Sequence, residues 1–120
     1  MTDYDIRYEP LFGTLETMNV QALIDAVQEP WYNQTLLQVG DVVVRLGVMQ
    51  GEFHWHKHDE QDEFFFVLEG RLDIELEDRT VVLEPGKGFV VPRGVMHFPH
   101  ARGRTVAMLV ELAGVVPTGD

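Results

Sequence analysis

The 120-residue sequence contains no cysteine. Disulfide bonds therefore cannot stabilise the fold, and thiolates cannot bind a metal. A reducing compartment suits such a chain, and we expect a cytoplasmic location. The sequence also lacks an apolar run of about 18 residues and the pattern of a signal peptide. These absences argue against a membrane-spanning or secreted protein, and a membrane is not an expected partner.

Positive charge is scarce as well. Nine lysines and arginines stand against 20 aspartates and glutamates, which gives a net charge of −11 at pH 7. Nucleic-acid binding depends on basic patches, so nucleic acid is not an expected partner either. We interpret the negative charge as a source of solubility. The length, together with 45% hydrophobic residues, predicts one domain that can bury a hydrophobic core.

The stretch from Gly51 to Gly70, GEFHWHKHDEQDEFFFVLEG, holds most of the residues that could carry chemistry. Histidines occupy alternating positions at His54, His56 and His58, and Glu63 follows. Alternate side chains of a β-strand share one face, so we expect the three imidazoles to point to one side. Imidazole nitrogens and a carboxylate oxygen suit divalent transition metals. A solvated polar loop with packed or surface histidines is the alternative interpretation.

A second stretch, from Gly86 to His100, supplies a further histidine in the sequence GKGFVVPRGVMHFPH. Pro92 and Gly94 predict a tight turn, which sets the direction of the segment that follows. We therefore expect His97 to lie beside the first group of histidines.

Together the two stretches resemble the two motifs of a small single-domain cupin. The first motif is His-x-His, then Glu after three or four residues and Gly after six more. The second is Gly, five residues, Pro-x-Gly, two residues and His. The matching positions are His56, His58, Glu63 and Gly70 in the first motif and Gly86, Pro92, Gly94 and His97 in the second.

The resemblance covers about residues 33 to 112 and departs from the usual pattern at two positions. Gly51 lies one residue closer to the first motif histidine than is usual, and Ala101 stands where the second motif often has Asn. Neither position is a metal ligand in the family. The resemblance implies one divalent transition metal (Fe, Mn, Ni, Co, Cu or Zn) held by His56, His58, Glu63 and His97.

We predict an all-β fold, a single cupin jelly-roll barrel or sandwich with a short N-terminal helix. Its regions are an N-terminal arm and helix at 1–32, the barrel at 33–113 and a C-terminal tail at 114–120. Apolar spacing predicts the helix over 19–28, with Asn19 as the N-cap. Strands are predicted at 34–39, 42–48, 63–68, 71–77, 80–83, 89–91 and 105–112, with a histidine strand after a turn at 50–51 and a short segment at 98.

Strand alternation also predicts which side chains line the site. His54 shares the parity of His56, so we expect it to face inward as a candidate for proton transfer. A structural histidine hydrogen-bonded near the barrel mouth is the equal alternative. Phe65 and Val67 should form an apolar wall. The two aromatic residues of opposite parity, Phe53 and Trp55, should pack under the helix or at a dimer contact.

The resemblance implies a metal-dependent enzyme that acts on a small oxygen-bearing organic molecule, as a dioxygenase, isomerase, lyase or cyclase. The fold does not select among these reactions. One alternative is a non-catalytic metal-dependent small-molecule binding or sensor module, and another is a structural metal barrel that holds a partner. We also expect a homodimer, because a barrel of about 80 residues leaves open sheet edges.

Overall fold

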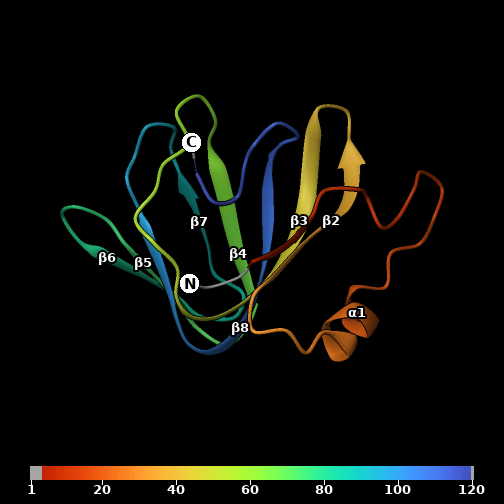
Figure 1. Ribbon diagram of the computed structural model, residues 1–120, viewed down its shortest axis with the longest axis horizontal. Coiled ribbons are helices and arrows are strands. Elements are labelled where there is room, and N and C mark those ends of the chain that lie inside the picture. The colour runs from red at the N-terminus through yellow and green to blue at the C-terminus, as the bar shows by residue number, and fades with distance from the viewer. Residues whose placement is uncertain (1–3, 120) are drawn as a thin grey trace.

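The computed structural model describes residues 4–119. These residues form one curled sheet and one short helix (Figure 1). The elements are β1 (Asp5–Arg7), α1 (Val20–Ala26), β2 (Tyr32–Val39), β3 (Val42–Glu52), β4 (Glu63–Glu69), β5 (Leu72–Glu75), β6 (Thr80–Leu83), β7 (Gly88–Val91) and β8 (Phe98–Leu112). The predicted all-β jelly-roll fold with a short N-terminal helix is confirmed. No helix within 4–119 has the length and apolar character needed to span a membrane.

Strand β8 connects the two sides of the barrel. The sheet runs in the order β1-β2-β3-β8-β4-β7, and β5 pairs with both β6 and β8. The sequence predicted a break between a short segment at 98 and a strand at 105–112, but β8 is continuous. The two arginines in the middle do not interrupt it because their side chains leave the sheet. Arg102 Nε lies 3.3 Å from Asp73 Oδ2, and Arg104 Nη2 donates to the carbonyl of Ile24 at 2.9 Å.

Helix α1 is shorter than predicted but begins where its cap indicated. The Asn19 side-chain oxygen accepts a hydrogen bond from the Ala22 amide at 3.1 Å, as an N-cap does. The helix ends at Ala26 because Val27 adopts an extended backbone, while the Val27 amide closes the last turn on the Leu23 carbonyl at 3.1 Å. The helix covers one face of the sheet, where its residue Ile24 joins a buried apolar cluster.

A second buried cluster lies between the opposing walls of the barrel. Its members come from five strands and include Phe65, Val67, Leu72, Ile74, Leu83, Val91, Ala101, Ala107 and Leu109. Alternate residues of β4 belong to this cluster, as expected for a strand with one face inward. These apolar side chains form the core between the walls of the barrel.

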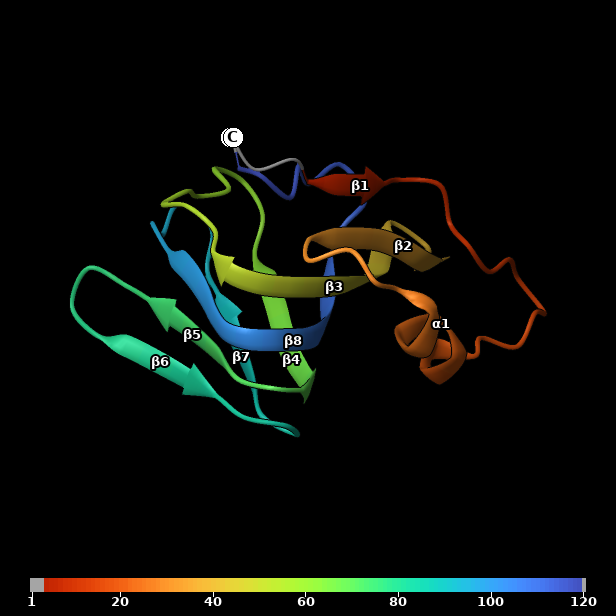
Figure 2. The same ribbon diagram turned by 60° about the horizontal axis from the view of Figure 1, so that its bottom comes forward.

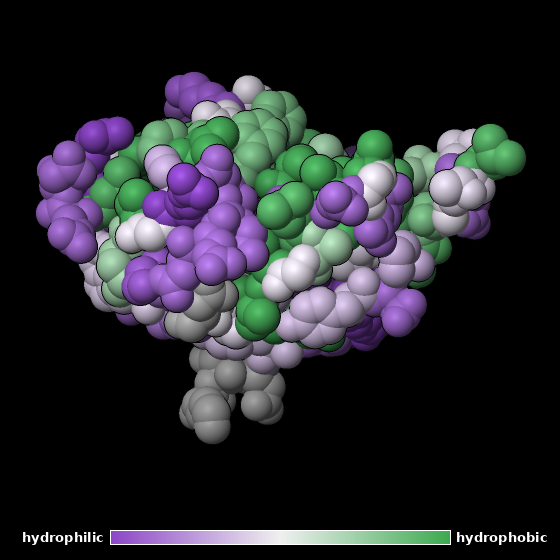
Figure 3. Space-filling view, turned by 90° about the horizontal axis from the view of Figure 1, so that it is seen from above, coloured by the Kyte–Doolittle hydropathy of each residue, from purple (hydrophilic) through white to green (hydrophobic). Residues whose placement is uncertain are grey.

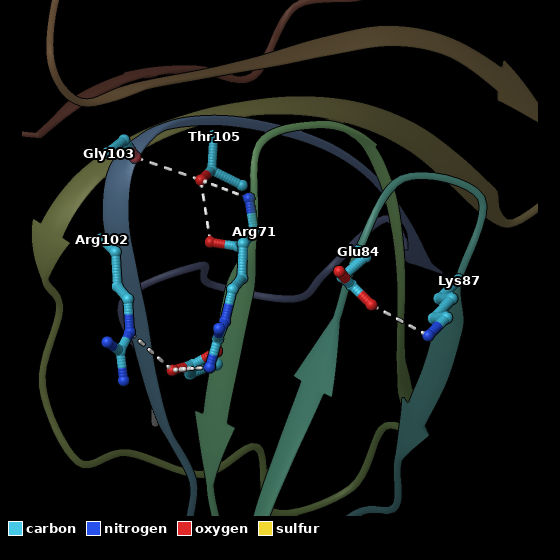
Figure 4. A network of polar contacts seen from close by, with 7 residues as sticks. Arg71, Glu84, Lys87, Arg102, Gly103 and Thr105 are labelled. Carbon is cyan, nitrogen blue, oxygen red and sulfur yellow. Dashed lines mark hydrogen bonds and ion pairs between the residues drawn. The ribbon is translucent and has the colours of Figure 1, made fainter.

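The turn before β5 depends on a glycine. Gly70 has a φ of +82°, and a Cβ there would lie 2.6 Å from the Arg104 carbonyl oxygen. Thr105 Oγ1 stabilises the same turn by donating a hydrogen bond to the Arg71 carbonyl at 2.9 Å and accepting one from the Arg71 amide at 3.2 Å (Figure 4). Only glycine tolerates both the close approach and the left-handed backbone.

The segment between β3 and β4 differs from its prediction. β3 continues through the predicted turn at 50–51 to Glu52, with a register shift between Met49 and Gly51. The predicted histidine strand is wrong, because residues 53–62 form no ladder apart from one isolated bridge between His56 and His97. The segment crosses from one strand to another, and single backbone hydrogen bonds such as that from the Phe53 amide to the Pro99 carbonyl at 3.0 Å hold it without forming a ladder.

The N-terminal arm contains a strand that the sequence did not reveal. β1 pairs in parallel with β2, with Asp5 opposite Tyr32. Figure 2 shows β1 above β2, near the C-terminal segment. Residues 1–3 of the predicted arm and residue 120 of the predicted tail lie outside the described residues. Pairing with the arm covers one sheet edge, and the homodimer stays a prediction.

Candidate metal centre

Four potential metal ligands come together from three separate segments. His56 and His58 lie between β3 and β4, Glu63 begins β4, and His97 immediately precedes β8. One ligand atom from each residue lies within 4.8 Å of those of the others, and all four side chains are buried. The two stretches of sequence that resemble the cupin motifs therefore meet at one point inside the barrel.

Backbone hydrogen bonds hold the two motifs against each other. The His56 amide donates to the His97 carbonyl at 3.0 Å, and the His97 amide donates to the His56 carbonyl at 2.9 Å. The Gly94 amide donates to the His58 carbonyl at 2.8 Å. The predicted tight turn between Pro92 and Gly94 thus helps to position a ligand of the first motif.

Hydrogen bonds also fix the ring orientation of two histidines. His56 Nδ1 lies 3.0 Å from the His54 carbonyl, and His97 Nδ1 lies 2.9 Å from the Val95 carbonyl. Because a carbonyl only accepts, Nδ1 carries the proton in each ring and Nε2 is left with its lone pair. Such bonds orient histidine ligands toward a metal.

Several buried donor atoms lack a regular hydrogen-bond partner. Within the described part of the chain these include both ring nitrogens of His58, Nε2 of His97 and Oε1 of Glu63. The Glu63 oxygen lies 3.4 Å from His58 Nε2 and 3.5 Å from His97 Nε2. Buried polar atoms are normally paired, so lone pairs that converge without partners fit a cation. Three imidazoles and one carboxylate suit a divalent transition metal.

The charge states at this site also favour a cation. Burial, and then the neighbouring His97, lowers the pKa of His56 to about 4. Burial alone would raise the pKa of Glu63, but the interactions with His58 and His97 outweigh it and lower the pKa overall. At neutral pH His56 is therefore neutral and Glu63 is ionised, which are the forms that bind a metal.

The metal-free protein should lose stability in acid because of His56. Its pKa is about 4 in the folded chain and about 6.5 as an ordinary histidine. Between these values the unfolded chain binds a proton that the folded chain does not, so acid favours unfolding. The contribution of neutral His56 to the free energy of unfolding is complete above about pH 6.5 and is lost as the pH falls toward about 4.

Urea unfolding in the presence of a chelator measures this effect. We expect His56 to account for about 2 kcal/mol of the decrease in unfolding free energy between about pH 7.5 and about pH 5. The control is His56→Gln, which removes the titrating group and should show a correspondingly smaller decrease. An identical decrease in both proteins would contradict the assignment to His56.

A buried ion pair lies directly behind Glu63. Glu111 on β8 faces Glu63 on β4, because the register pairs their neighbours Val110 and Phe64. Arg45 Nε lies 2.8 Å from Glu111 Oε1, and both side chains are almost wholly buried. The pairing of Arg45 with Glu111 was not predicted from the sequence. The signal was a charged residue at a core-facing position within each of two apolar strands.

The ionised form of Glu111 depends on Arg45. Burial, and then the neighbouring Glu63, raises the pKa of Glu111, although Arg45 opposes the increase. The contact of 2.8 Å between Arg45 Nε and Glu111 Oε1 favours the carboxylate form of Glu111 inside the barrel. Arg45 and Glu111 are therefore each other's buried partners, and Glu63 is left as the carboxylate among the candidate metal ligands.

A cavity lies beside the candidate ligands and is lined in part by His56 and Glu63. The predicted wall residue Phe65 lines it, but Val67 lies deeper, in the inner apolar cluster. Phe53 also lines the cavity and packs against Tyr4 and Trp31, so its predicted place under the helix is wrong, and the predicted dimer contact stays a prediction. The reason is that its segment is not a regular strand, and the alternation of side chains does not hold there.

His54 and Trp55, which follow Phe53, lie outside the cavity lining. Trp55 is 44% exposed, and its ring centroid lies 5.6 Å from that of Phe98 rather than against the helix. His54 is half-buried, and its Nε2 lies 2.7 Å from the Thr118 carbonyl oxygen. Its other nitrogen, Nδ1, lies 3.5 Å from the Tyr4 hydroxyl. His54 is thus at the rim, next to His56 but with both nitrogens engaged.

Comparisons with known proteins agree with this architecture. The model of the family described as "Cupin domain" matches residues 35–113. The "Uncharacterized protein YdbB" of Bacillus subtilis is 39% identical over 94 residues, which are 78% of this chain and 83% of that protein. A solved cupin-2 domain containing protein from Shewanella frigidimarina has a TM-score of 0.77 and 31% identity, covering 80% of this chain and 94% of the other.

A more distant similarity links the chain to an enzyme. The 3-hydroxyanthranilate 3,4-dioxygenase of Xanthomonas euvesicatoria is 26% identical over 89 residues. The match covers 71% of this chain but spans only half the length of that enzyme.

Proposed function

This chain belongs to the cupin family, and from that premise we propose that it is a metal-dependent enzyme acting on a small oxygen-bearing organic molecule. A dioxygenase, isomerase, lyase or cyclase reaction would suit such a site. The observation that carries the proposal is the position of the four buried donors beside a cavity lined mainly by aromatic and aliphatic side chains. Apolar cavities with a few convergent polar groups are the usual binding sites of small organic ligands.

Four residues of the chain would hold the metal, namely His56, His58, Glu63 and His97. A divalent ion with these ligands supplies Lewis acidity toward oxygen donors and, if it is iron, reactivity with O₂. A six-coordinate ion would have two further positions for water or substrate. Open positions distinguish catalytic sites from closed structural ones.

The surrounding residues would prepare the site for chemistry. Phe53 and Phe65 present apolar surface beside the ligands, which excludes water and strengthens electrostatic interactions. His54 is the candidate for proton transfer because its ring centroid lies 5.1 Å from that of His56, at the rim of the cavity. Its contact with the Thr118 carbonyl would have to open for His54 Nε2 to reach a bound molecule.

The alternative function is a non-catalytic metal-dependent binding or sensor module. One observation favours it, because both ring nitrogens of His54 already have partners in Tyr4 and Thr118. In that arrangement His54 shapes the rim and transfers no proton. The two functions share the same metal site and differ in turnover.

Product analysis distinguishes the two functions. Metal-loaded and metal-stripped protein are incubated with a panel of keto acids, diketones and sugars, and products are identified by mass spectrometry. We expect the metal-loaded form to convert at least one compound and the metal-stripped form to convert none. Tight binding of one compound without conversion of any would favour the binding module and contradict the enzyme.

Replacing His54 tests its role in catalysis. If His54 transfers a proton, His54→Gln should reduce turnover by about 10²-fold or more while metal content stays the same. A glutamine preserves a hydrogen-bonding side chain of similar size, so the contact with the Thr118 carbonyl can persist. Elemental analysis and the dissociation constant of the substrate provide the controls. Unchanged turnover would remove His54 from the mechanism and leave it as a structural residue.

A further inference from the structure

Aromatic and aliphatic side chains form most of the cavity wall beside the candidate ligands. Tyr4, Trp31 and Phe53 pack together there, with ring centroids 4.6 Å apart for Tyr4 and Phe53 and 5.6 Å apart for Trp31 and Phe53. Phe65 and Met49 face them from the barrel strands. We infer that the ligand of this site is an uncharged, largely apolar molecule with oxygen donors at one end. This inference rests on the proposed function, because the donors are assigned to the metal.

The charges around the cavity disfavour an anionic ligand. Among the described lining residues the ionisable acids are Asp5 and Glu63, and none is a lysine or arginine. The buried cation of the barrel, Arg45, is paired with Glu111 and is not part of the lining. A carboxylate or phosphate on the part of the ligand that lies away from the metal would lose its hydration without gaining a positive side chain, and burial of an unpaired charge is unfavourable.

One polar group on the wall indicates where the ligand carries a hydrogen-bond donor. Asn33 lines the cavity from β2, and its side-chain oxygen is buried without a hydrogen-bond partner in the described part of the chain. Buried polar atoms without partners are unfavourable. An O–H or N–H group on the ligand, separate from the oxygen donors at the metal, would satisfy this oxygen.

The two ends of the chain close the cavity over its ligand. Tyr4 from the N-terminal arm and Pro117 from the C-terminal tail both line it. His54 contacts both ends, through the Tyr4 hydroxyl and the Thr118 carbonyl. Gly119 has a φ of +102°, and a Cβ on it would lie 2.7 Å from His56 Cβ. The C-terminal tail therefore packs directly on His56, a candidate metal ligand. Tyr4 and Pro117 at the two ends of the chain limit the access of water to the cavity.

The surface near the tail is also partly apolar. Figure 3 looks onto the loop end of the barrel, where apolar residues reach the surface between charged ones. Leu112 at the end of β8 and Val116 in the tail are 44% and 41% exposed.

A matched pair of ligands tests the inference. 4-tert-Butylcatechol and 3,4-dihydroxybenzoate offer the same two adjacent hydroxyls, but the first carries an apolar group and the second a carboxylate. Calorimetry with the metal-loaded full chain under argon measures both affinities, and titration of the free metal ion corrects for any intrinsic difference. We expect the tert-butyl compound to bind at least about 10-fold more tightly, from burial of its apolar group.

Paired variants locate the preference in the cavity. Phe53→Ala should reduce the ratio of the two affinities by about 5-fold or more, since it removes part of the wall. Trp55→Ala, two residues away and outside the lining, should leave the ratio unchanged. Circular dichroism of both variants verifies that they fold, and the ratio in the parent protein tests the inference even if one does not.

The outcomes separate this inference from the proposed function. A metal-loaded chain that binds the carboxylate as tightly as the tert-butyl compound, or binds neither, contradicts the ligand class but not the metal site. Elemental analysis that finds no bound divalent metal overturns the proposed function and this inference with it. An unchanged ratio in a folded Phe53→Ala variant would also overturn the inference, because the preference would then arise elsewhere.

Discussion

Replacing His97 with alanine is expected to weaken divalent-metal binding by about 10²-fold or more, because even changes around the ligands of metal sites cost about 10–100-fold. His97 Nε2 is buried, lacks a regular hydrogen-bond partner among the described residues and converges on Glu63. Its ring is already oriented by the Val95 carbonyl. The variant therefore removes a donor from a site whose other residues stay in place.

His100→Ala is the matched control for this variant. His100 lies three residues further along the chain, on β8 opposite Glu52 and Asp73, and is not one of the four candidate ligands. Metal content is measured by elemental analysis of protein purified without a tag, and affinity by competition with a chelator. We expect about one ion per chain in the parent protein and the control. Full occupancy in a double variant of His56 and His58 to alanine would contradict the metal site altogether.

Among the variants proposed for this protein, removal of the Glu111 carboxyl group is expected to cause the largest loss of stability. Glu111→Leu should lower the free energy of unfolding by about 3–5 kcal/mol, the usual effect of breaking a buried ion pair. The reason is that Arg45 is 1% exposed and cannot lose its proton, so it would remain charged inside the barrel without its ion-pair partner. Urea unfolding of chelator-treated protein measures the change.

A second variant distinguishes the lost partner from lost packing. The combination of Arg45→Met with Glu111→Leu removes both charges and fills the space with apolar groups, so it should recover most of the stability. Lys87→Met is the surface control, because Lys87 lies 3.1 Å from Glu84 with both side chains 60% exposed. We expect that variant to change stability by less than about 1 kcal/mol. A double variant as unstable as Glu111→Leu alone would contradict the electrostatic explanation.

Local patterns in the sequence determined the parts of the protein that depend on neighbouring residues. The N-cap at Asn19 and the hairpin around Gly40 follow from residue types a few positions apart. The left-handed backbone of Gly70 likewise falls between the predicted strands at 63–68 and 71–77. The resemblance of the two motifs to those of cupins implied the four residues that the structure brings within 4.8 Å of one another. The cap, the hairpin and the turn could be predicted because their geometry is set by short-range backbone constraints.

The tertiary structure alone decided which distant residues meet at the site. Phe53 and His54 were assigned by strand alternation, but residues 53–62 form no ladder, so parity gave the wrong position for Phe53. The pairing of Arg45 with Glu111 spans β3 and β8, and the closure of the cavity joins Tyr4 to Pro117. Alternation within a single strand predicts which face of the sheet a side chain occupies. Which residue that side chain contacts depends on how the sheet curls. The identities of the metal ligands were thus implied by two short motifs, while the ligand cavity and the buried ion pair behind Glu63 depend on contacts between distant segments of the folded chain.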